Sequence, residues 1–106
     1  MKRTDWSNYL SEASARRLAL AASKNADYAK EDDILLNFKQ VSAICQILDI
    51  DSRRSPEDCV LFFEVHKLQR YCNLRGREPG NEAVQDTVDD GCVYWDLAMA
   101  ARRDAE

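Results

Sequence analysis

Apolar residues recur at helical spacing through residues 34–48, and this pattern constrains the fold more than any other feature of the chain. Ile34, Phe38, Val41, Cys45 and Leu48 follow one another in steps of four, three, four and three. Such steps place the side chains on one face of a helix, whereas a half-buried strand needs alternation at every second residue. The segment therefore predicts an amphipathic helix that packs against other helices.

Three further helices are expected, over residues 4–24, 55–74 and 81–103. The first is rich in alanine and can be capped by one of its first polar residues. The third has a strong start, because Ser55 suits the cap position and Pro56 suits the first helical position. Their apolar stripes are Val60, Leu61, Val65, Leu68 and Cys72 in the third helix, and Val84, Val88, Cys92, Trp95 and Met99 in the fourth.

These four segments predict an all-α fold, with residues 1–106 as a single four-helix bundle-like domain. A chain of 106 residues is long enough for one core and too short for two. No segment alternates with the period of a strand, and short loops make an antiparallel bundle the simplest arrangement.

Composition narrows the classes of function. A net charge of −4 with dispersed basic residues argues against an extended nucleic-acid surface. The four cysteines form no C-x-x-C pair and fall in apolar helical runs, which favours small buried side chains in a reducing compartment over a zinc site. With no signal peptide or membrane span expected, the predicted location is the cytoplasm, that of the host cell if the chain is phage-encoded.

Acidic and basic residues on the third and fourth helices are the strongest candidates for a functional site. Glu64, Lys67 and Arg70 follow at i,i+3 spacing, and Asp86 and Asp90 are i,i+4. Antiparallel neighbouring helices would let Glu64 face the aspartates across a groove. Three carboxylates suit Mg²⁺, which prefers oxygen ligands, and the two cations suit phosphates. Water attack on a phosphoanhydride is the chemistry such a site would support.

A structural interpretation of the same residues stays open. Lys67 could form an ordinary ion pair with Asp86 or Asp90, because charged residues on helices are mostly solvated or paired. Tyr28, the only large side chain in the polar segment 23–33, either closes the edge of the core or stacks on a ligand.

The order of several short motifs resembles small phage and prophage proteins. These motifs are Lys67-x-x-Arg70, Asp86-x-x-x-Asp90-x-x-x-Tyr94 and the upstream segment KNADYAKEDDILLNF, and together they span roughly residues 24–98. They are similar to the MazG-like all-α nucleoside triphosphate pyrophosphatase superfamily and to nucleotide-modification-associated domains. The resemblance implies a helical bundle that binds a nucleotide with magnesium.

Under this resemblance Glu64, Asp86 and Asp90 would be the catalytic metal ligands, while Lys67, Arg70 and Tyr28 would hold the nucleotide. Catalytic relatives carry E-x-x-E on one helix and E-x-x-D on the next, whereas this chain has Leu61 three residues before Glu64 and Lys67 three residues after it. Three functions are therefore expected as alternatives: a magnesium-dependent pyrophosphohydrolase, a nucleotide-binding module or sponge without chemistry, and a small acidic protein that binds and inhibits a host protein. The alanine-rich first helix is a candidate surface for a homo-oligomer.

Overall fold

The computed structural model describes the backbone of residues 1–28, 33–76 and 81–106, and the side chains of residues 1–23, 33–76 and 84–106. It contains the helices α1 (Arg3–Tyr28), α2 (Leu36–Ile47), α3 (Pro56–Leu74) and α4 (Asn81–Asp104). These described ranges hold no strand. The predicted all-α class with four helices is confirmed.

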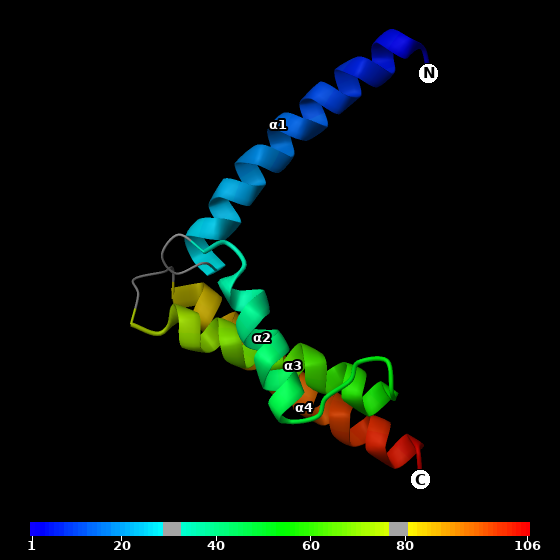
Figure 1. Cartoon of the computed structure of the whole chain (residues 1–106), viewed down its shortest axis with the longest axis vertical. Helices are drawn as coiled ribbons and strands as arrows, with labels where there is room; N and C mark the ends of the chain where they lie inside the picture. The colour runs from blue at the N-terminus through cyan, green and yellow to red at the C-terminus, as the bar shows by residue number, and fades with distance from the viewer. Residues whose placement is uncertain (29–32, 77–80) are drawn as a thin grey trace.

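Helix α3 is the centre of the packed part of the molecule. It lies antiparallel along α4, and α2 packs against another side of α3, while α1 extends away as a single helix (Figure 1). The radius of gyration is 17.9 Å, whereas a compact chain of this length has about 13 Å. The arrangement therefore differs from a compact antiparallel bundle in the position of α1.

Local signals explain where the helices begin. The Ser55 hydroxyl accepts a hydrogen bond from the Asp58 backbone N–H at 3.1 Å, which confirms the predicted cap of α3. Helix α2 begins at Leu36, slightly later than its apolar pattern indicates, because Asp33 accepts the Leu35 N–H at 2.9 Å in a turn before the helix. Helix α1 continues to Tyr28, past its expected end.

The core is small and lies where α2 meets α3. Val41, Cys45 and Val65 form its buried centre, and Phe62 is among the partly buried residues packed against them. On α4 the buried side chains are Thr87 and Ala98, not the predicted apolar stripe. The residues predicted to be buried but found exposed are Ile34, Phe38, Leu48, Leu68, Val88, Cys92, Trp95 and Met99.

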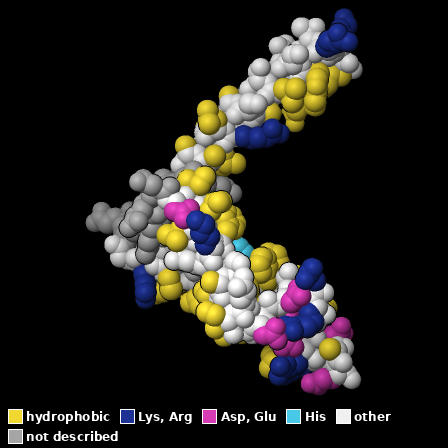
Figure 2. Space-filling view, in the orientation of Figure 1, with side chains coloured by type: hydrophobic (Ala, Val, Ile, Leu, Met, Phe, Trp, Pro, Cys, Tyr) yellow, Lys and Arg dark blue, Asp and Glu magenta, His cyan; other side chains and the backbone are white. Residues whose placement is uncertain are grey.

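Ion pairs hold the connector between α2 and α3. Arg54 bonds to Asp58 at 2.7 Å and to Asp49 at 3.2 Å, and Asp49 has a positive φ of 55°. Arg102 of α4 bonds to Glu57 at 3.2 Å at the same end of the molecule. Figure 2 shows acidic and basic side chains gathered at the end of the molecule opposite α1. In the ranges given above, no helix is both long and apolar enough to cross a membrane.

Candidate functional site

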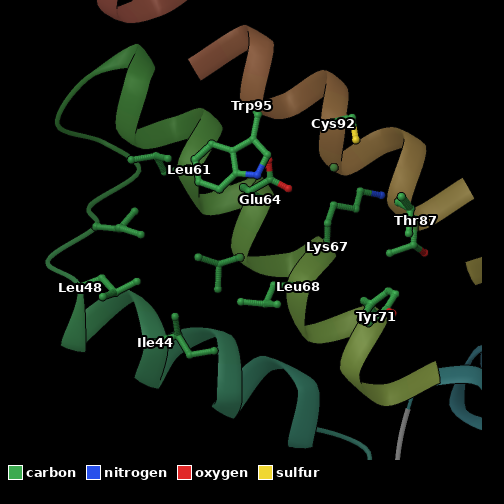
Figure 3. A pocket seen from close by; sticks show the side chains of 14 residues that line it. Ile44, Leu48, Leu61, Glu64, Lys67, Leu68, Tyr71, Thr87, Cys92 and Trp95 are labelled. Carbon is green, nitrogen blue, oxygen red and sulfur yellow. The ribbon is translucent and has the colours of Figure 1, made fainter. Parts of the chain in front are cut away.

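The three charged residues of α3 that the sequence suggests as site residues, Glu64, Lys67 and Arg70, are divided between two cavities. One is an apolar groove of about 530 Å³ between α2 and α4, with α3 as its floor (Figure 3). The other, which we call the recess, has about 580 Å³ and is lined by α3 together with parts of α1, α2 and α4. Glu64 lines the groove, Arg70 lines the recess and Lys67 lines both. The three residues therefore do not share one site, contrary to the expectation from their spacing.

Glu64 is held in the groove beside α4 (Figure 3). Its Oε2 atom is buried and has no hydrogen-bond partner among the described residues. Burial raises the pKa of the Glu64 carboxyl, and the charge of Lys67 opposes this rise. Gly91 of α4 makes room for the group, since a Cβ at this position would lie 3.0 Å from Glu64 Oε1. A glycine in mid-helix, unexpected on propensity, is thus explained by close approach of the two helices.

Lys67 is paired with Asp90. Its Nζ lies 3.1 Å from Asp90 Oδ2 and 5.9 Å from the centre of the Tyr94 ring. The lysine side chain is 22% exposed and that of Asp90 is 56% exposed, so water screens the pair and its contribution to stability is small. This is one of the two ion pairs that the sequence offers as an alternative to a metal site.

The predicted magnesium ligands do not fit a single ion in this arrangement. Among the residues whose side chains are described, no three His, Cys, Asp or Glu residues lie close enough together to hold a metal. The Lys67 ammonium forms an ion pair with the carboxylate of Asp90, and Asp86 is exposed on α4. Glu64, Asp86 and Asp90 therefore stay a prediction as metal ligands, with no support from geometry.

The recess combines aromatic rings with cations. Phe63 and Tyr94 stack with ring centres 5.7 Å apart and an angle of 10° between the planes. His66 meets the Phe38 ring edge-on at 6.5 Å, and burial followed by the charge of Lys67 lowers the pKa of the imidazole. Arg70 completes the basic side of the recess. Stacked rings beside two cations can hold a planar group that carries an anion.

Three aromatic residues of the recess were not identified as site residues from the sequence. The sequence does contain a signal for Phe63. It lies four residues before Lys67 and seven before Arg70, so the three side chains share a helix face. The positions of Phe38 and Tyr94 beside that face depend on helix packing. Tyr28 is the last residue of α1, and its side chain lies outside the described residues.

No known protein family, curated protein or solved structure has significant similarity to this chain. The resemblance to MazG-like proteins and the phage origin therefore remain predictions.

Replacing Glu64 by glutamine should change how stability depends on pH. The unfolded chain ionises Glu64 near the ordinary value of 4.5, and the folded chain ionises it at higher pH. Protonated Glu64 therefore contributes its full stabilisation to the fold below about pH 4.5. This stabilisation is lost as pH rises through the higher pKa of Glu64 in the folded chain. We expect the stability of Glu64→Gln to rise relative to that of the wild type as pH increases from about 4 towards neutral, because only the wild type loses the stabilising proton. Urea unfolding measures it, and a difference that is constant across this range would contradict the placement of Glu64.

Proposed function

We propose that this chain binds a nucleoside phosphate in the recess. The observation that carries the proposal is the position of Lys67 and Arg70 beside the stacked rings of Phe63 and Tyr94 in one cavity. The two cations are the residues that the sequence predicts for phosphate binding. The rings supply a surface on which a base can stack, at a typical gain of about 1–3 kcal/mol.

The dimensions and charge of the recess support a small ligand over a polymer. Its volume of about 580 Å³ lies within the range of about 300–1,000 Å³ usual for small-molecule sites. The whole chain carries −4, so attraction of an anion depends on the local cations and not on the overall field. Arg70 can bind phosphate oxygens with two parallel hydrogen bonds, while Lys67 can act as a point charge that the phosphate shares with, or takes from, Asp90.

Binding without turnover is the form of the proposal that the geometry favours. The hydrolytic form would use Glu64, Asp86 and Asp90 with magnesium, and it requires Asp90 to leave Lys67. A carboxylate already paired with an ammonium is a poor metal ligand until that pair opens. Pyrophosphate release from nucleoside triphosphates, present with magnesium and absent with a chelator, would establish the hydrolytic form.

A thermal unfolding assay with a panel of nucleotides tests the proposal. Each nucleoside triphosphate, diphosphate and free nucleoside is added with a chelator present, so that metal plays no part. At a hundred times its dissociation constant, a bound nucleotide adds about 2.7 kcal/mol of stability. For a chain of this size the melting temperature should rise by roughly 10–20 °C. We expect this for a phosphorylated ligand and a smaller rise for its nucleoside.

The control for this assay is Lys39→Ala. Lys39 is an exposed lysine that pairs with Asp33 at 2.8 Å and does not line the recess. It should respond to nucleotide as the wild type does, whereas Lys67→Ala should respond less. A melting temperature that no nucleotide changes would remove the proposal.

A further inference from the structure

The groove is an apolar surface that the packed helices leave uncovered. Three of its side chains are large and well exposed: Leu48 at 62%, Leu68 at 54% and Trp95 at 59%. Leu48 directly follows α2, Leu68 belongs to α3 and Trp95 to α4, and all three face the same hollow (Figure 3). In a four-helix bundle a fourth helix would cover such a hollow between three others.

Helix α1 is the complementary feature, a helix that, among the described residues, meets the rest of the chain only near its C-terminal end, where it contacts α3 (Figure 1). Among residues 1–23 every side chain except Ala13 is exposed, including Trp6, Tyr9 and Leu10. Trp6 and Tyr9 stack with ring centres 5.7 Å apart, which makes one continuous apolar patch with Leu10. Figure 2 shows hydrophobic side chains on α1 far from the rest of the molecule. Most of the stability of a helix in a protein comes from packing an apolar face, and the apolar face of α1 around Trp6, Tyr9 and Leu10 is left exposed within its own chain.

The exposed area of the chain matches what a dimer would bury. The accessible surface is 8274 Å², whereas a compact monomer of 12.1 kDa exposes about 6,000 Å². The excess is roughly 2,200 Å² per chain. Obligate homodimers bury about 2,000–5,000 Å² over both partners, and their interfaces are apolar. Two chains together expose about 4,400 Å² in excess of two compact monomers, which lies within this range.

We infer that α1 of a second copy occupies the groove, in a symmetric dimer in which two copies exchange their first helices. Helix α1 has 26 residues and α4 has 24, so both are about 36–39 Å long and can lie side by side. A two-fold axis makes both contacts reciprocal.

Mass measurement by light scattering at micromolar concentration tests this inference. The wild type should have twice the mass of 12.1 kDa. Leu68→Glu, which puts a charge in the groove, and Trp6→Glu, which puts one on α1, should each have the mass of a single chain. The control Val93→Glu changes a residue that is 57% exposed and does not line the groove, and it should remain a dimer.

Mixing the two monomeric variants distinguishes helix exchange from other dimers. The intact groove of Trp6→Glu can accept the intact α1 of Leu68→Glu, so the mixture should regain a dimer with one of the two contacts. A dimer made by two α1 helices against each other would not be restored, because one helix in each pair carries the charge. Absence of recovery would therefore overturn the exchange.

A milder substitution, which shortens a side chain without adding charge, keeps the inference testable if the charged variants do not fold. Trp95→Ala leaves the groove apolar and should raise the dimer dissociation constant about tenfold or more while keeping the helical circular dichroism signal. A wild type with the mass of a single chain would overturn the inference. A wild-type dimer that keeps its affinity in both Leu68→Glu and Trp95→Ala would also overturn it.

Discussion

Replacing Arg70 by alanine is expected to weaken binding of a nucleoside triphosphate by a factor of roughly 10–100. Arg70 lines the recess on the side of α3 that carries Phe63 and Lys67. A hydrogen bond to a charged group is worth about 1.5–3 kcal/mol, and an arginine–phosphate contact is of this kind. Titration calorimetry in the presence of a chelator measures the change without any contribution from metal.

The control for this prediction is Arg53→Ala. Arg53 is an arginine whose side chain is 88% exposed and which pairs with Asp51 at 3.2 Å in the connector before α3. It should bind the nucleotide as tightly as the wild type. Melting temperatures without ligand must accompany the titration, because loss of Arg70 can also lower stability. An equal loss of affinity in both variants, or none in Arg70→Ala, would contradict the assignment of the recess.

Replacing Phe62 by alanine is expected to have the largest effect on stability, about 3 kcal/mol. Phe62 packs against the core of Val41, Cys45 and Val65, and its ring meets His66 edge-on at 4.7 Å. The substitution removes both the apolar burial and the ring contact, and it leaves a hole in a core that has few other members. The melting temperature should fall by roughly 12–24 °C when measured at a fixed chain concentration.

Phe38→Ala is the matched control for Phe62→Ala. Phe38 also contacts His66, but its side chain is 57% exposed and it lies outside the buried centre of the core. Its loss should cost less than about 1 kcal/mol. If the two variants unfold at the same urea concentration, the core is not located where α2 meets α3.

The start of α3 could be predicted from the sequence because its signals are local. A serine cap followed by proline and two acidic residues fixes the first turn without reference to any other part of the chain. The same reasoning gave the four helices and the all-α class. It failed at the end of α1, where the polar segment after Lys24 continues as helix to Tyr28.

The buried face of α4 could not be predicted in the same way. Periodicity indicates which residues share a face, but it does not indicate which face another helix covers. The apolar stripe that includes Val88 and Trp95 faces the groove, while the closest approach to α3 is made at Gly91, beside Glu64, and the buried residue further along α4 is the small Ala98. Small side chains allow the helices to approach closely, and the hydrophobic stripe is left exposed.

The division of Glu64 and Arg70 between two cavities has a geometric cause. Each residue turns the helix by about 100°, so a step of three residues falls about 60° short of a full turn. Two such steps separate Glu64 from Arg70 by about 120° around α3. The pairs Glu64–Lys67 and Lys67–Arg70 are neighbours, but the outer two residues face different sides. Lys67, between them, lines both cavities.

The central claim is that a nucleoside phosphate binds in the recess, and the most direct test is an amide nuclear magnetic resonance titration of the labelled chain. On addition of a nucleoside triphosphate with a chelator present, the largest shift changes should gather at Phe63, Lys67, Arg70 and Tyr94, which line the recess. Residues of the groove such as Leu48 and Leu68 should change little. Changes centred on the groove, or no saturable change at any residue, would contradict the claim.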